Sequence, residues 1–249
     1  MTHQRENLVL IHGLLGSLTY FDPNKYLSWV DVYTPDMYCY GGSDYLENLT
    51  LQDQVNFVKR FILENINEPC WILGHSVGGA ISNIFASQNS ELVKGIINVE
   101  GNFTLNDAFW CQRISRMNID EWTSEYEKIS SNPEDWLRDV AIELTLERVK
   151  WAKNILSYQT AQAALTVACA VVNGTNTPEY RDAVDKVIES GIPVYLVAGE
   201  HSVKDWDIPA NVRKSAKDFH IIGNTGHMIM LEKPKEFCDL IIKIVASRI

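Results

Sequence analysis

Short apolar runs, each ended by turn-forming residues, recur in the first and last parts of the chain. Six of them predict β-strands, at residues 8–11, 30–34, 70–73, 93–99, 194–198 and 219–222. Most are apolar on both faces, which is the pattern of strands buried in a parallel sheet. Helical patterns alternate with the strands, at residues 51–64, 77–88 and 233–247. The alternation predicts an α/β fold with a mostly parallel sheet and helices on both faces.

One long segment, residues 103–190, lacks the strand pattern and is rich in helix signals instead. Thr104 and Asp107 have the spacing of a capping box, which starts a helix. Asn173-Gly174 predicts a break between two helices, because this pair favours turns. We therefore expect a helical cap inserted into the sheet domain. The predicted domains are a core of residues 1–102 and 191–249 and a cap of residues 103–190.

The strongest chemical motif is G-x-S-x-G at residues 74–78. It follows an apolar strand and opens a helix, the context of a nucleophile elbow, in which Ser76 is exposed on a sharp turn. The helix N-terminus favours negative charge that develops beside the serine. The backbone N–H of Val77 and that of Leu14, which follows the first strand, are the predicted oxyanion donors. Gly13 permits close backbone approach at that point.

A candidate base, His227, follows the last predicted strand in the loop 223–227. A histidine beyond the carboxyl end of a strand is well placed to take the proton from Ser76. His12 and His75 are interpreted as structural. No metal-ligand spacing and no nucleotide-binding loop is present, so we expect neither a metal nor a cofactor.

Composition narrows the choice of partners. The 249 residues carry a net charge of −10, which argues against nucleic acid and anionic membranes as partners. No apolar stretch reaches the roughly 18 residues of a membrane span, and the four-residue run at 8–11 is too short for a signal peptide. The five cysteines are scattered without a C-x-x-C pair, which favours reduced thiols. We expect a cytoplasmic protein that does not insert into membranes.

These motifs together resemble the α/β-hydrolase family, in its small capped form, across nearly the whole chain. The resemblance is carried by the His-Gly pair after the first strand, the elbow at Ser76, the helical insertion and His227 with its Glu-x-Pro tail. It implies a sheet shortened at its N-terminus, since family members usually have two preceding antiparallel strands. Cys39 stands where the family generally has glycine.

The chain departs from the family at the triad acid. Most members have an aspartate three residues after the glycine that ends the strand following the cap, and here that position is Ser202. Glu100, which ends the strand after the nucleophile helix, is the predicted acid, because some branches of the family take it from that strand. A carboxylate at the end of a buried strand also needs a partner. Asp205 and Asp207 are the alternatives.

The predicted function is hydrolysis of an ester, thioester or related acyl bond through an acyl-enzyme on Ser76. The expected partner is a small, partly apolar acyl substrate, with Trp110 and Met228 predicted to line its pocket. Two alternatives keep the fold. One is a non-hydrolytic enzyme, such as a cofactor-free dioxygenase or a lyase, and the other is a small-molecule receptor.

Overall fold

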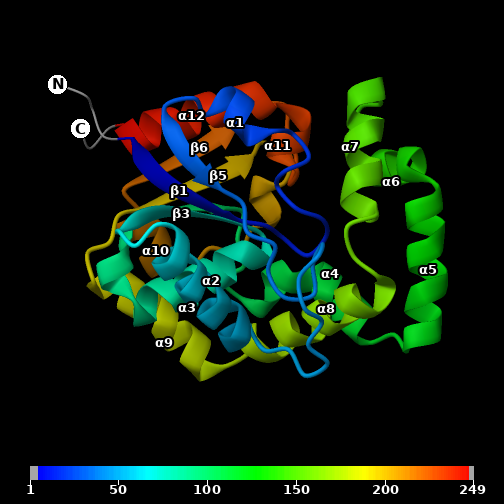
Figure 1. Ribbon diagram of the computed structural model, residues 1–249, viewed down its shortest axis with the longest axis horizontal. Coiled ribbons are helices and arrows are strands. Elements are labelled where there is room, and N and C mark those ends of the chain that lie inside the picture. The colour runs from blue at the N-terminus through cyan, green and yellow to red at the C-terminus, as the bar shows by residue number, and fades with distance from the viewer. Residues whose placement is uncertain (1–4, 247–249) are drawn as a thin grey trace.

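Six parallel strands form one sheet through the centre of the computed structural model, which describes residues 5–246 (Figure 1). The strand order is β2-β1-β3-β4-β5-β6. The strands are β1 Glu6–Ile11, β2 Val30–Tyr33, β3 Cys70–His75, β4 Val93–Val99, β5 Val194–Gly199 and β6 Asp218–Ile222. All six predicted strands are present, and the predicted α/β fold is confirmed.

Helices flank the sheet and extend beyond one of its edges. They are α1 Pro23–Tyr26, α2 Leu51–Asn65, α3 Val77–Gln88, α4 Phe109–Ser115, α5 Ile119–Ser131, α6 Pro133–Asp139, α7 Leu146–Leu156, α8 Ala161–Thr175, α9 Pro178–Glu189, α10 Ala210–Ser215, α11 Ile229–Glu232 and α12 Pro234–Ala246. Short 3₁₀ turns are η1 Ser90–Leu92, η2 Leu105–Ala108 and η3 Val203–Asp205. The predicted last residue of the final helix, Ser247, lies outside the described residues.

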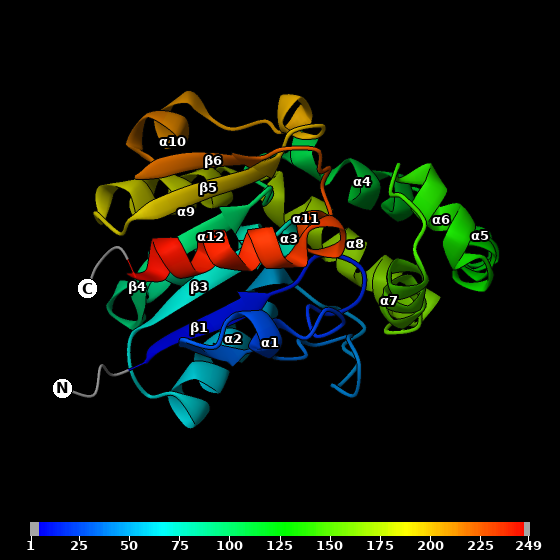
Figure 2. The same cartoon turned by 90° about the horizontal axis from the view of Figure 1, so that it is seen from above.

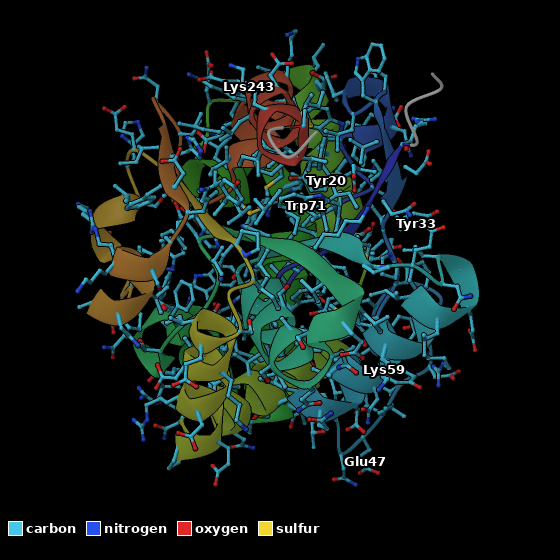
Figure 3. All side chains as sticks on the ribbon, turned by 90° about the vertical axis from the view of Figure 1, so that its left-hand side faces the viewer. Tyr20, Tyr33, Glu47, Lys59, Trp71 and Lys243 are labelled. Atoms are coloured by element: carbon cyan, nitrogen blue, oxygen red, sulfur yellow. The ribbon has the colours of Figure 1, made fainter. Side chains whose placement is uncertain are left out.

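Side chains alternate between the two faces of the sheet, since successive residues of a strand point to opposite sides. Leu10 and Trp71 pack with α1 and α12 on one face, where Figure 3 labels Trp71. Val9 and Ile72 pack with α2, α3 and α9 on the other face. Both faces are therefore covered, which explains why the strands are apolar throughout.

The strand order places a switch point between β1 and β3. The chain goes from β1 to β2 on one side, then returns to β3 on the other side of β1. The loops that leave the carboxyl ends of β1 and β3 therefore diverge. Ligands of open α/β sheets bind at such a point, and here His12–Leu14 and Ser76 follow these two strands.

The inserted segment is helical, and its helices fall into two groups. Helices α4 to α8 lie past the carboxyl ends of the strands (Figure 2). Helix α9 lies beside α3 on a face of the sheet. The cap boundary at residue 190 stays a prediction, since α9 packs on α3 and the end of α8 packs on α2.

One local prediction within the insertion is wrong. Asn173-Gly174 does not separate two helices but lies in the last turn of α8. A Cβ on Gly174 would lie 2.6 Å from Leu51 Cδ1, so glycine serves the packing of α8 on α2 there. Within residues 5–246, no single helix has the length and hydropathy of a membrane span. The α7–α8 pair meets that test only when both helices, bent by 79°, are counted together.

A matched pair of glycines tests how tightly the sheet is packed. Gly95 of β4 lies opposite Trp71 of β3, and a Cβ on it would be 2.4 Å from a ring carbon of that tryptophan. Gly42 has no atom within 4 Å of such a Cβ. Gly95→Ala should lower the free energy of unfolding by about 1–3 kcal/mol, and Gly42→Ala should change it by less than about 0.5 kcal/mol. Urea unfolding measures both, and equal effects would contradict this packing.

Candidate active site

A sharp turn carries Ser76 from β3 into α3. Its φ of 54° and ψ of −120° are rare for a residue with a side chain. Two glycines make the turn possible, because a Cβ on Gly74 would lie 2.4 Å from the Gly78 carbonyl oxygen, and one on Gly78 would lie 2.2 Å from that of Ile11. The predicted elbow is thus present, with its serine at the start of a helix.

A second pair of glycines brings the turn after β4, which contains Glu100, into contact with the elbow at Ser76. A Cβ on Gly79 would lie 2.5 Å from the Cα of Gly101, so the first turn of α3 touches the backbone that follows β4. The Ser76 carbonyl accepts the N–H of Asn102 at 3.1 Å. The elbow and the turn after β4 therefore form one rigid unit, and Glu100 lies in that turn.

Glu100 contacts the candidate base directly. Its Oε2 lies 2.8 Å from Nδ1 of His227. The Glu100 side chain is only 4% exposed, whereas that of His227 is 44% exposed, so the carboxylate is shielded while the imidazole stays accessible. Glu100 has a φ of 42°, another uncommon backbone angle, which is stabilised by hydrogen bonds around it.

The other oxygen of Glu100 has its own partners. Oε1 accepts the N–H of Gly199 at 2.7 Å and the hydroxyl of Ser202 at 2.5 Å. Burial raises the pKa of Glu100, but the hydrogen bonds from His227, Ser202 and Gly199 outweigh it and leave this pKa below its usual value. The carboxyl group is therefore ionised at neutral pH, beside the imidazole.

Among the described residues, the two alternative acids, Asp205 and Asp207, form no hydrogen bond with His227. Asp207 Oδ2 accepts the hydroxyl of Thr104 at 2.7 Å and the side-chain amide of Asn106 at 2.9 Å. It therefore ties the loop after β5 to the beginning of the inserted helical segment, at η2. Asp205 lies in η3 and has no hydrogen bond to His227 within residues 5–246. Of the three candidate acids, Glu100 is the one that contacts the histidine.

His75 holds the loop that carries the candidate base. Its Nε2 donates to the His227 carbonyl at 3.0 Å, and the two imidazole rings lie 4.7 Å apart. Burial lowers the pKa of His75 to about 3, so this ring is neutral and its single proton is on Nε2. Glu232 fixes the same loop by accepting the N–H of Gly226 at 2.7 Å. Since His75 precedes Ser76, the loop with the candidate base is anchored next to Ser76.

A similar arrangement orients the predicted oxyanion donor after β1. The Gly13 carbonyl accepts the Tyr40 hydroxyl and the Nδ1–H of His12, each at 3.1 Å. In a trans peptide the N–H of Leu14 points away from that carbonyl. Within residues 5–246, neither the Leu14 N–H nor the Val77 N–H has a hydrogen-bond acceptor. This loop lies close to the serine, since a Cβ on Gly13 would lie 3.1 Å from Ser76 Cβ.

The two predicted pocket residues are both partly buried. Trp110 of α4 is partly buried and packs against the apolar clusters of both sheet faces. Met228 directly follows His227 and is also partly buried. Among residues 5–246, no three His, Cys, Asp or Glu side chains are arranged to hold a metal ion.

Sequence reasoning missed the supporting residues of this site. It treated His75 as packing, His12 as a loop residue and Ser202 only as the loss of an acid. Their hydrogen bonds to His227, Gly13 and Glu100 depend on contacts between distant strands. A signal was available for Glu232 alone, whose Glu-x-Pro context marks the start of the last helix.

Comparison with known proteins agrees with this architecture. A sequence profile described as the alpha/beta hydrolase family matches residues 8–240. The chain belongs to the alpha/beta hydrolase family. The resemblance inferred from the elbow and the histidine loop is therefore confirmed.

The relatives of this alpha/beta hydrolase carry more than one activity. A 2-succinyl-6-hydroxy-2,4-cyclohexadiene-1-carboxylate synthase from Klebsiella pneumoniae is 24% identical over 247 residues, covering 96% of this chain and 94% of the relative. A carboxylesterase of Nitrososphaera gargenis has a similar structure, with a TM-score of 0.76, 21% identity and coverage of 98% of this chain and 91% of the other. An esterase from Exiguobacterium antarcticum also has a similar structure, with a TM-score of 0.74 and 14% identity. The match covers 97% of this chain and 92% of the other.

The two buried histidines yield a spectroscopic prediction. Burial lowers the pKa of His12 to about 4 and that of His75 to about 3, so neither ring should become charged between about pH 5 and 8. His12 should carry its proton on Nδ1 and His75 on Nε2. Ring ¹⁵N chemical shifts measure both properties, with His75→Gln used for assignment. A charged His75 ring above about pH 5, or its proton on Nδ1, would contradict the geometry.

Proposed function

We propose that this protein is a serine hydrolase that cleaves a carboxylic ester, thioester or related acyl bond. The proposal rests on one observation above the others, the contact of 2.8 Å between the His227 Nδ1 and a buried, ionised Glu100. This contact lies beside the strained turn of Ser76. A serine, an accessible imidazole and a shielded carboxylate are the parts that acyl transfer needs.

In the first half of the reaction, His227 acts through its Nε2. Nδ1–H donates to Glu100, so Nε2 carries a lone pair and accepts the proton of Ser76. The serine oxygen attacks the substrate carbonyl carbon, and the carbonyl π electrons move onto its oxygen. The N–H groups of Leu14 and Val77 stabilise that oxyanion. Collapse of this intermediate expels the alcohol or thiol, which takes the proton from His227.

The second half regenerates the serine. Water gives a proton to Nε2 of His227 as its oxygen attacks the acyl carbon bound to Ser76. The tetrahedral intermediate then expels the serine oxygen, which takes the proton back, and the free acid leaves. Glu100 stays ionised throughout and stabilises the imidazolium that forms in each half.

The substrate proposed for this site is small and partly apolar. Trp110 packs against both apolar clusters, and Met228 follows the base in sequence. We propose that these two side chains contact the acyl group, with helices α4 to α8 covering it. Three arginines of the cap are paired with acidic neighbours: Arg113 with Glu125, Arg138 with Asp135, and Arg148 with Glu143. These three side chains are therefore less available to a carboxylate of a substrate.

A second candidate function is a lyase reaction. The Klebsiella relative is named as a synthase of a cyclohexadiene carboxylate, and the same Ser76–His227 pair can abstract a proton from a carbon acid. The two candidates differ in one intermediate, because only the hydrolase forms a covalent acyl-enzyme. Mass spectrometry of protein quenched during turnover of short- and medium-chain esters and thioesters distinguishes them.

The nucleophile assignment has a direct test. A fluorophosphonate probe should label Ser76 alone, since that serine adjoins a base and two free N–H donors. Ser76→Ala should fold normally, lose labelling and lose at least about a thousandfold in ester hydrolysis. Ser82→Ala is the matched control on the same helix, and it should keep labelling. Labelling of another serine, or undiminished turnover by Ser76→Ala, would rule out this mechanism.

The acid assignment predicts a large effect of an isosteric change. In Glu100→Gln, the amide oxygen must take the Oε1 position, because Gly199 and Ser202 both donate there. The amide NH₂ then faces Nδ1 of His227, which is forced to accept and to carry its proton on Nε2. That tautomer cannot take a proton from the serine, so kcat should fall about a hundredfold to ten-thousandfold.

Asp207→Asn provides the control for this variant. It alters a carboxylate that contacts Thr104 and Asn106 rather than the histidine. Its kcat should stay within about threefold of wild type. A large loss in Asp207→Asn together with an active Glu100→Gln would reassign the acid to the loop after β5.

A further inference from the structure

Ser202 occupies an unusual place in the hydrogen-bond network of the site. Its hydroxyl lies 2.5 Å from Glu100 Oε1 and 3.4 Å from the Gly199 carbonyl, so the carboxylate is its principal acceptor. Glu100 and Ser202 come from the ends of neighbouring strands, β4 and β5. The serine is thus joined to the acid of the proposed triad without contacting the substrate-binding side of the histidine.

The two oxygens of Glu100 have separate partners. Oε2 faces His227, and Oε1 faces the Gly199 N–H and the Ser202 hydroxyl. Because two donors bind Oε1, they fix the orientation of the carboxylate plane. This orientation keeps Oε2 within hydrogen-bond distance of the His227 Nδ1. The Gly199 N–H belongs to β5 and is fixed by the sheet, whereas the Ser202 hydroxyl is the one donor to Oε1 that a side-chain substitution removes.

We propose that Ser202 is a positioning residue, which orients and stabilises the Glu100 carboxylate so that His227 keeps the tautomer and orientation needed for proton transfer. This inference rests on the proposed function. It assigns a role to a serine at the position where related chains carry the acid itself. The position therefore still serves the histidine, but through Glu100.

The inference predicts a change in pH dependence. The titratable groups that face Glu100 are His227 and His75, and His75 is neutral because burial lowers its pKa to about 3. The hydrogen bond from Ser202 is one of the interactions that lower the pKa of Glu100. A hydroxyl that donates to the carboxylate stabilises its charged form. Its removal should move the acidic limb of kcat/KM to higher pH.

The experiment compares Ser202→Ala with Ser202→Thr in the full chain, using a short-chain p-nitrophenyl ester. In Ser202→Ala the acidic limb of kcat/KM should rise by about half a unit to one unit, and kcat at neutral pH should fall about three- to tenfold. Ser202→Thr keeps the hydroxyl and should keep the wild-type limb. Melting curves of both variants should show that each is fully folded at the assay temperature, which separates positioning from folding.

The same substitution in the Glu100→Gln background completes the test. If the hydroxyl acts through the carboxylate, Ser202→Ala should change kcat/KM there by less than about twofold. An unmoved acidic limb in Ser202→Ala, or an equal loss in both backgrounds, would overturn the inference while leaving the hydrolase mechanism intact. Wild-type turnover by Glu100→Gln would instead overturn the assignment of Glu100 as the triad acid, and this inference with it.

Discussion

The backbone reversal at Ser76 is the constraint on which the rest of the site depends. A φ of 54° with ψ of −120° turns the chain from a buried strand into a helix within one residue. The turn exists only because Gly74 and Gly78 let backbone atoms approach to distances that a side chain would forbid. Through Gly78, the helix start touches β1 at the Ile11 carbonyl, and so the loop with the predicted oxyanion donor is placed beside the serine.

The charge of Glu100, at the carboxyl edge of the sheet, is stabilised by hydrogen bonds between residues that follow different strands. Ser202 after β5 donates to Glu100 after β4, which binds His227 after β6, whose carbonyl is bound by His75 at the end of β3. The carboxyl ends of β3, β4, β5 and β6 therefore each contribute one residue to a continuous series of hydrogen bonds. A buried carboxylate is costly without such partners. The parallel order of the strands provides them, because it gathers four carboxyl ends on one edge.

Much of this arrangement could be predicted from the sequence, and the reason is local patterning. Strands apolar on both faces and a glycine-flanked serine carry their signals within a few neighbouring residues, so the six strands and the elbow were predictable. The break assigned to Asn173-Gly174 was wrong because Gly174 is selected by contact with Leu51, more than a hundred residues away. The roles of His75 and Ser202 were missed for the same reason, since each depends on a partner from another strand.

The place of the acid follows from the order of the strands. Strand β4 lies between β3, which carries the serine, and β5, whose neighbour β6 carries the histidine loop. A carboxylate after either β4 or β5 can therefore reach the histidine, and the longer side chain of glutamate suits the strand farther from it. Acidic residues at both positions would be costly, because carboxylates in contact repel each other unless they share a proton. Once Glu100 supplies the charge, the neighbouring position is best filled by a small hydrogen-bond donor, and serine meets that requirement.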